Sequence, residues 1–255
     1  MLLTVDIGNT NITLGLFQGD TLVLTSRLAT DHAKTEDQYA IDLMSIFRLN
    51  RIESFSGAIL SSVVPSLDRT FRYAIQKVTG VTPLVVGPGT RTGMNIRIDN
   101  PAQLGADLLV GAVAAADRYG TPCIVWDLGT ATTVSVVDAA GDFRGGAIMP
   151  GLQTSLRSLS SNASLLPHVS LEAPKNTIGT NTIDCMRSGA VYGTASMLDG
   201  MNTRILDELE QEATVVITGG LGREIAPHCL YQPIYDDDLL LHGLRLIYEK
   251  NRKQF

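Results

Sequence analysis

Thr4-Val5-Asp6-Ile7-Gly8-Asn9-Thr10 decides the fold, because a closely similar stretch returns 121 residues further along the chain. The second copy is Val125-Trp126-Asp127-Leu128-Gly129-Thr130-Ala131-Thr132. Each copy reads as a strand, an aspartate, a glycine turn and a second strand. Since the spacing is about half of the 255 residues, the sequence predicts two similar halves whose acidic turns face each other across a cleft.

The paired turns have the composition of a phosphate-binding site. Glycine permits a tight turn that exposes backbone N–H groups, so such a turn can hold phosphate without a cationic loop. An aspartate at the end of an apolar strand is costly to bury unless it is paired or lies near a cation. We therefore expect Asp6 and Asp127 to hold metal, directly or through water. The expected donors to phosphate oxygens are Asn9, Thr10, Asn11, Thr13, Thr130 and Thr132.

Composition restricts the class of protein. A chain with 44% apolar residues can bury a large core, and its 26 acidic and 20 basic residues are dispersed without a basic run. Nucleic acid is therefore not expected as a partner. The longest apolar stretch, Leu108 to Ala116, is far shorter than the ~20 residues of a membrane helix, and no signal-peptide pattern is present. We expect a cytoplasmic protein with no membrane partner.

The three cysteines, Cys123, Cys185 and Cys229, are odd in number and widely spaced. This pattern fits neither a disulfide framework nor a zinc site, so we expect all three to be reduced and structural.

The order of elements supports the duplication. Thr35-Glu36-Asp37-Gln38 matches a capping box at the start of a helix, and a helix from about Gln103 to Tyr119 divides the halves, giving predicted domains 1–115 and 116–255. Other expected helices cover 66–80, 152–159, 182–210 and 236–250. The expected strands are 2–7, 12–17, 22–28, 58–64, 83–86, 123–128, 133–138, 143–149 and 214–218.

Three further motifs have two interpretations each. Asp107, in Gly105-Ala106-Asp107, either favours a helix N-terminus or orients the hydroxyl that accepts a phosphoryl group. The segment 177–182 either caps the long helix through Asn181 or Thr180, or binds a polar substrate. The glycine-rich segment 218–222 is either a strand-to-helix turn or a place where adenosine approaches the backbone.

Taken together, these motifs resemble the type III pantothenate kinases over nearly the whole chain. The resemblance implies an α/β, duplicated ribonuclease-H-like fold of the actin, Hsp70 and sugar-kinase type, with two lobes around a nucleotide cleft. The motifs that carry it are Asp6 to Thr10, Asn100-Pro101 with Gly105-Ala106-Asp107, Asp127 to Thr132, Gly151, Gly179 to Thr182, and Ser188-Gly189.

The resemblance also implies a reaction, in which ATP phosphorylates the primary hydroxyl of pantothenate in the first step of coenzyme A biosynthesis. It makes Asp107 the catalytic base and Asp127 the ligand of a monovalent cation (K⁺ or NH₄⁺). Magnesium accompanies ATP, and the protein is a homodimer. The implied pantothenate site is Gly105, Ala106, Asp107 and Thr182. The implied ATP site is Asp6, Ile7, Gly8, Asn9, Thr10, Asn11, Ile12, Thr13 and Thr130.

The chain departs from this family at two positions. An arginine usually follows Gly-Ala-Asp, with an asparagine three residues later, and here these positions are Leu108 and Gly111. The change removes an always-charged bidentate group. Our hypothesis is that Arg91, Arg97 or Arg187 replaces it. The alternative functions are a non-catalytic nucleotide-binding regulatory relative and a phosphohydrolase of the same fold.

Overall fold

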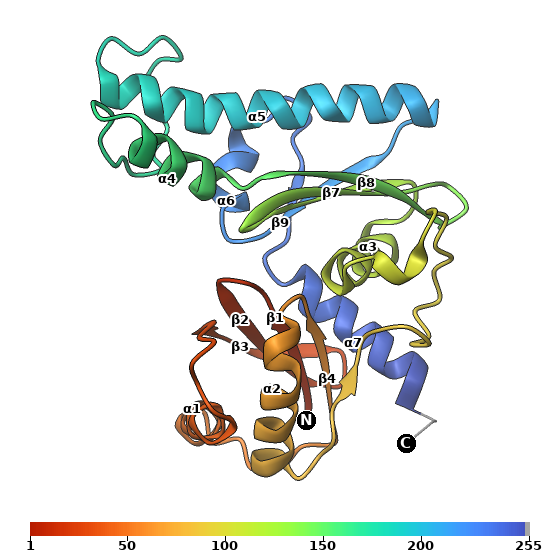
Figure 1. Ribbon diagram of the computed structural model, residues 1–255. Coiled ribbons are helices and arrows are strands. Elements are labelled where there is room, and N and C mark those ends of the chain that lie inside the picture. The colour runs from red at the N-terminus through yellow and green to blue at the C-terminus, as the bar shows by residue number, and fades with distance from the viewer. Residues whose placement is uncertain (253–255) are drawn as a thin grey trace. The chain divides into compact units, whose positions relative to one another are not determined.

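The computed structural model describes residues 1–252, which form two compact units (Figure 1). The first unit contains Met1–Gly93, Asn100–Ala114 and the described residues from 240 onward, and the second contains Met94–Asp99 and Ala115–Leu239. The boundary expected at 115 lies one residue from the division between Ala114 and Ala115, and two further segments are assigned differently. Residues 94–99 join the second unit, where Arg97 Nε pairs with Asp142 Oδ2 at 2.9 Å. Residues 240–252 join the first unit.

The first unit is built on a five-stranded sheet of order β3-β2-β1-β4-β5. Strands β1 to β3 form the expected antiparallel meander, whereas β4 pairs in parallel with both β1 and β5. The strands are β1 (Leu2–Ile7), β2 (Asn11–Gln18), β3 (Thr21–Ala29), β4 (Gly57–Ser62) and β5 (Leu84–Val85).

The second unit repeats this topology in the sheet β8-β7-β6-β9-β10. In the first sheet Asp6 pairs with Ser61 of β4, and in the second Asp127 pairs with Thr218 of β9. The duplication expected from the sequence is therefore present in the strand pairing itself. The strands are β6 (Cys123–Leu128), β7 (Ala131–Val137), β8 (Phe143–Pro150), β9 (Thr214–Thr218) and β10 (Ile234–Tyr235).

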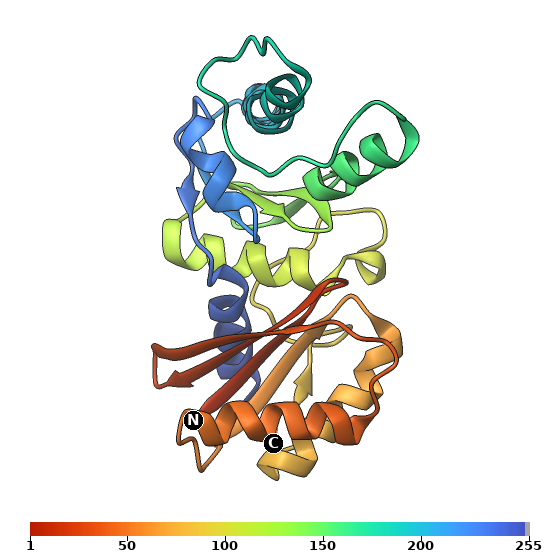
Figure 2. The ribbon, with the colours of Figure 1, turned by 90° about the vertical axis from the view of Figure 1, so that its left-hand side faces the viewer.

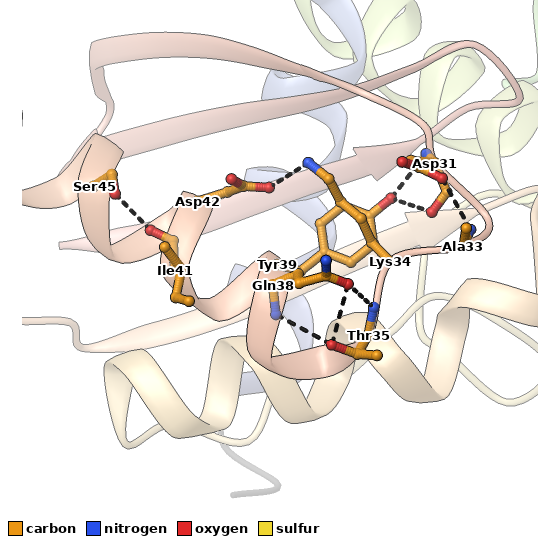
Figure 3. A network of polar contacts seen from close by, with 9 residues as sticks. All are labelled: Asp31, Ala33, Lys34, Thr35, Gln38, Tyr39, Ile41, Asp42 and Ser45. Atoms are coloured by element: carbon orange, nitrogen blue, oxygen red, sulfur yellow. Dashed lines mark hydrogen bonds and ion pairs between the residues drawn. The ribbon is translucent and has the colours of Figure 1, made fainter.

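Two helices, α1 (Glu36–Leu49) and α2 (Pro65–Thr79), cover one face of the first sheet and complete its apolar core. The expected capping box is confirmed, since Thr35 N–H donates to Gln38 Oε1 at 2.9 Å and Gln38 N–H donates back to Thr35 Oγ1 (Figure 3). The Tyr39 hydroxyl donates to Asp31 O and accepts from Asp31 N–H, each at 2.9 Å. These bonds fix the chain between β3 and α1.

The opposite face of the first sheet is covered by α7 (Leu239–Asn251). A Cβ on Gly15 would lie 2.9 Å from Leu241 Cδ1, so the helix approaches the sheet at a residue without a side chain. His242 packs edge-on against Phe17, with ring centroids 5.2 Å apart. This packing is why the C-terminal segment joins the first unit.

In the second unit, α4 (Leu152–Asn162) and α5 (Thr182–Leu209) lie on the same side of the sheet (Figure 2). Trp126 is fully buried beneath them, and its Nε1–H donates to Asn202 Oδ1 at 2.8 Å. The short helix α6 (Gly222–Ile225) and the 3₁₀ turn η2 (Ala226–His228), both absent from the sequence-based expectations, complete this core.

Two expected helix starts are wrong by three residues. Helix α3 (Ala106–Tyr119) begins after the 3₁₀ turn η1 (Pro101–Gln103), which Asn100 caps. Helix α7 begins at Leu239, after a turn in which Asp236 Oδ1 accepts from Asp238 N–H at 3.2 Å, while Asp236 Oδ2 accepts from the Tyr119 hydroxyl at 2.8 Å. Within residues 1–252 no helix is long and apolar enough to cross a membrane.

Candidate functional site

The β1–β2 turn is held so that its polar side chains stay exposed. Gly8 N–H donates to Asn11 O at 3.0 Å, and Thr30, just after β3, donates from its hydroxyl to Gly8 O at 2.6 Å. Asn9, Thr10 and Asn11 are exposed. The turn therefore presents amide and hydroxyl donors on a fixed backbone, as phosphate binding requires.

Two residues of the expected ATP site have buried side chains, unlike the exposed residues of the turn. Ile7 and Ile12 flank the turn as a strand pair, and both side chains are fully buried in the core of the first unit. Their side chains fix the hairpin on the sheet, so only their backbone groups can meet a ligand.

Asp6 is a half-buried carboxylate at the end of β1. It accepts a hydrogen bond from Ser61 Oγ at 2.6 Å, and Ser61 is fully buried on the neighbouring strand. The pKa of Asp6 is raised from 3.8 to about 6, because burial and, to a smaller extent, the negative charge of Asp107 raise it more than the Ser61 hydrogen bond lowers it. Two carboxylates thus act on each other within the first unit.

Asp107 lies in the first turn of α3, where its side chain folds back on the helix. Leu108 N–H donates to Asp107 Oδ1 at 2.8 Å. A Cβ on Gly105 would lie only 2.6 Å from the same oxygen, so a larger residue at that position would displace the Asp107 carboxylate. Burial raises the pKa of Asp107, and hydrogen bonds from backbone N–H groups partly oppose this effect. The Gly-Ala-Asp motif therefore packs on itself.

The β6–β7 turn in the second unit is one residue shorter and is packed more tightly. Gly129 N–H donates to Ala131 O at 3.0 Å. A Cβ on Gly151 would overlap the carbonyl oxygens of Gly129 and Thr130, and a Cβ on Gly219 would overlap Asp127 Oδ1. Gly219 also has a φ of 89°, which favours glycine. Two glycine turns therefore enclose the half-buried Asp127.

Sequence reasoning missed Ser61. The signal was present, because Ser61 ends the apolar run of β4 as Thr218 ends that of β9. Both hydroxyl residues are buried, and each lies beside the aspartate of its own sheet. A search for a hydroxyl residue after each second apolar strand would have found the pair.

A cavity of about 850 Å³ lies in the second unit between α4, α5 and the segment before α5. Thr182 lines it, together with Thr132 of β7. The side chain of Asn181 accepts from Asp184 N–H at 3.0 Å, which confirms the expected helix cap. Cys185 Sγ donates to Gly179 O at 3.3 Å and thereby fixes the segment over the helix.

The cysteines are all free, but they differ in exposure. Cys123 and Cys229 are buried, as expected for structural residues. Cys185 is exposed and lines the cavity, where its hydrogen bond to Gly179 O gives it a structural contact despite its exposure. Its place in the first turn of α5, with its backbone N–H bonded to Asn181 O at 2.9 Å, directs it toward the cavity side of the helix.

Of the arginines considered as substitutes at Leu108, Arg97 and Arg187 have carboxylate partners of their own. Arg97 pairs with Asp142, and Arg187 pairs with Glu172 at 2.9 Å and donates to Ser170 Oγ at 2.6 Å. Arg91 donates from its backbone N–H to Asn251 Oδ1 at 3.1 Å. None of the three lines the cavity of the second unit.

Carboxylate, imidazole and thiolate side chains do not gather into a ready-made metal site in the described part of the chain. Within residues 1–252 no cluster of three or more His, Cys, Asp or Glu side chains could hold a metal ion. Mg²⁺ is usually held by one or two carboxylates, with phosphates and water completing its octahedron. Asp6 fits this donor set, because burial without a cation disfavours its charged form.

Comparison with known proteins identifies relatives over the whole chain. The sequence profile of the type III pantothenate kinase family matches residues 2–204. A type III pantothenate kinase from Halalkalibacterium halodurans is 44% identical over 253 residues, covering 98% of this chain and 100% of that protein. A second one, from Exiguobacterium sp., is also 44% identical, over 99% of this chain and 100% of its own length.

Solved structures agree with the fold. The putative Baf family transcriptional activator of Campylobacter jejuni superposes with a TM-score of 0.61 at 21% identity, over 98% of this chain and 99% of its own. With the repeated strand order, the duplicated ribonuclease-H-like α/β fold is confirmed.

The buried carboxylate predicts a pH-dependent stability for protein free of nucleotide and metal. The folded carboxyl of Asp6 keeps its proton up to about pH 6, whereas the unfolded one loses it near 3.8, so the wild type loses stability as pH rises through this interval. Asp6→Asn should therefore gain up to ~3 kcal/mol relative to wild type by pH 7, and much less at pH 4.5. Urea unfolding at both pH values measures this gain. The exposed Asp99→Asn is the control, and a gain for Asp6→Asn that is equal at both pH values would contradict the assignment.

Adjacent glycines provide a second prediction. Gly219→Ala should destabilise the second unit by ~1–3 kcal/mol, since it places a Cβ against Asp127 at a positive φ. Gly220→Ala, with open space around its Cβ, should change stability by less than ~0.5 kcal/mol. The urea midpoint, followed by fluorescence of the single tryptophan Trp126 in the same unit, measures both variants. Equal midpoints would show that Gly219 does not confine Asp127.

Proposed function

The chain belongs to the type III pantothenate kinase family, and we propose that it transfers the γ-phosphoryl group of ATP to the primary hydroxyl of pantothenate, the first step of coenzyme A biosynthesis. The observation that carries this proposal is 44% identity to a protein of that name over 98% of the chain. The regulatory and phosphohydrolase alternatives are not favoured by such relatives.

Asp107 is the proposed base. The hydroxyl oxygen of pantothenate attacks the γ-phosphorus, the bond from that phosphorus to the β,γ-bridging oxygen breaks, and ADP leaves. The hydroxyl proton passes to the Asp107 carboxylate. A raised pKa makes this carboxylate a stronger base than an ordinary aspartate, and its bond with Leu108 N–H holds it in one orientation.

The β1–β2 turn is the proposed phosphate-binding element. Its exposed side chains at 9–11 and its backbone N–H groups can donate to phosphate oxygens without a lysine. Thr13, opposite Asp6 in the hairpin, and Thr130 of the β6–β7 turn extend the proposed ATP site. Including these two threonines is supported by their position in the two corresponding hairpins of the repeated sheets.

Asp6 is proposed to hold the Mg²⁺ that accompanies ATP, and Asp127 a monovalent cation, K⁺ or NH₄⁺. When bound, such cations neutralise charge on the phosphates. The protein's own contribution is to keep each carboxylate in place, Asp6 through Ser61 and Asp127 through its glycine neighbours. For pantothenate we propose Gly105, Ala106 and Thr182 as binding residues. Thr182 is supported by its place in the wall of the cavity.

We also propose a homodimer formed through the second unit. Large apolar side chains stay exposed around the cavity segment, with Leu165 91% and Ile178 84% exposed. Apolar side chains gathered on one surface are typical of an interface. Ile178→Asp should therefore convert a dimer to a monomer in sedimentation equilibrium, whereas Leu230→Asp, at an exposed position elsewhere in the unit, should not. Wild-type protein that sediments as a monomer would refute this interface.

The central experiment is an assay of ADP and phosphopantothenate formation with ATP and Mg²⁺. Phosphate transfer only with pantothenate, and faster in K⁺ than in Na⁺, is expected. Asp107→Asn should lower kcat by roughly 10²–10⁴-fold with little change in ATP binding, because it removes a base. Asp117→Asn, at an exposed position of the same helix, is the control. ATP loss without pantothenate would favour the phosphohydrolase, and nucleotide binding without turnover would favour the regulatory relative.

A further inference from the structure

The hydroxyl of Ser61 is spent on one oxygen of the Asp6 carboxylate. Ser61 Oγ donates to Asp6 Oδ1 at 2.6 Å, a distance typical of a hydroxyl bonded to a charged carboxylate. Ser61 is fully buried, so water does not compete for this hydrogen bond. A hydroxyl has one proton to donate, and a buried one without an acceptor is unfavourable. The bond therefore couples the orientation of the two side chains.

The first sheet fixes the distance between these two side chains. Strands β1 and β4 pair in parallel along the whole of β1, and Asp6 lies directly opposite Ser61 in this register. Ile59 and Leu60, which precede Ser61 on β4, are fully buried and anchor the strand in the molecule. The position of the Ser61 hydroxyl is thus set by the sheet, independently of any ligand.

The bond also determines which oxygen of Asp6 can meet a cation. The two oxygens of a carboxylate point in different directions, so holding Oδ1 toward Ser61 turns Oδ2 away from β4. Asp6 is half-buried whereas Ser61 is fully buried, so solvent reaches the carboxylate from the side away from Ser61. Outer hydrogen-bond partners orient metal-binding carboxylates in this way, and their loss typically costs ~10–100-fold in metal affinity or activity.

We propose that Ser61 is a positioning residue for phosphoryl transfer, whose hydroxyl holds the Asp6 carboxylate with Oδ2 directed toward the Mg²⁺ of the bound nucleotide. The inference rests on the proposed function, in which Asp6 is the Mg²⁺ ligand. Ser61 contacts neither the cation nor the substrate. It acts through Asp6, so its contribution disappears when Asp6 no longer binds the cation.

The test measures the nucleotide affinity of the full-length protein with and without a divalent cation. The probe is β,γ-imido-ATP, titrated calorimetrically as its Mn²⁺ complex and again in EDTA. The Kd in EDTA divided by the Kd of the Mn²⁺ complex is the cation enhancement. Ser61→Ala should lower this enhancement at least tenfold, while the Kd in EDTA changes by less than threefold. A merely structural role would weaken both forms of the nucleotide alike and would overturn the inference.

Two matched variants separate the hydroxyl from the packing of β4. Ser61→Thr keeps the hydroxyl and should keep the enhancement within threefold of wild type, since the second sheet has the buried Thr218 at the corresponding position. Ser62→Ala removes the next hydroxyl of the strand, which accepts from Val64 N–H at 3.1 Å and should leave the enhancement unchanged. Thermal unfolding checks that each variant is folded. A folded Ser61→Thr as weak as Ser61→Ala, or an equal loss for Ser62→Ala, overturns the inference.

Combination with Asp6→Asn shows whether Ser61 acts through Asp6. Asp6→Asn should remove most of the enhancement, and adding Ser61→Ala should then change it by less than twofold. An equal effect of Ser61→Ala in both backgrounds overturns the inference, as does no effect of Ser61→Ala where Asp6→Asn lowers the enhancement, and the proposed function then stands. No effect of Asp6→Asn overturns the Mg²⁺ assignment together with the inference, whereas the assay with pantothenate tests the reaction itself.

Discussion

The burial of Asp6 is the constraint on which the first unit's chemistry depends. A carboxylate at the end of an apolar strand is unfavourable when charged, yet this one lies beside a second carboxylate, Asp107, that disfavours its charge further. The Ser61 hydroxyl offsets only part of the effect. A cation beside Asp6 would relieve this effect, which is the physical support for the proposal that Asp6 holds one.

The two sheets share one topology but differ in the turn that follows the first strand. In both, an aspartate ends the first strand and a buried hydroxyl residue lies beside it on the parallel neighbour. The first copy then has a three-residue turn with exposed amide and hydroxyl side chains, and the second a shorter turn enclosed by Gly151 and Gly219. The first is suited to donate to a ligand, whereas the second confines its carboxylate.

Local sequence predicts local structure well in this chain. The bounds of β1, β6 and β9 and the start of α5 match the expectations, because apolar runs end at glycine turns or capping residues there. The capping box at Thr35 was predicted correctly because it is formed within four consecutive residues, Thr35 to Gln38. Such features depend on neighbours in the chain, and a single sequence displays them directly.

What could not be predicted depends on contacts between distant residues. Ser61 meets Asp6 across 55 positions, and α7 joins the first sheet through Gly15 and Phe17, more than 200 positions away. The cavity of the second unit likewise arises from the packing of α4 against α5, which no periodicity displays. The family resemblance supplied the candidate residues, whereas the wall of the cavity is visible only in the fold.

The return of α7 to the first sheet also bears on how the molecule is made. Synthesis supplies β1, β2 and β3 well before α7, the helix that covers their second face, because the whole second unit lies between them in the chain. Until then the face around Gly15 and Phe17 lies bare to water and to other chains. The second unit, nearly continuous in the chain, can mature earlier, so the nascent protein completes its later-encoded part first.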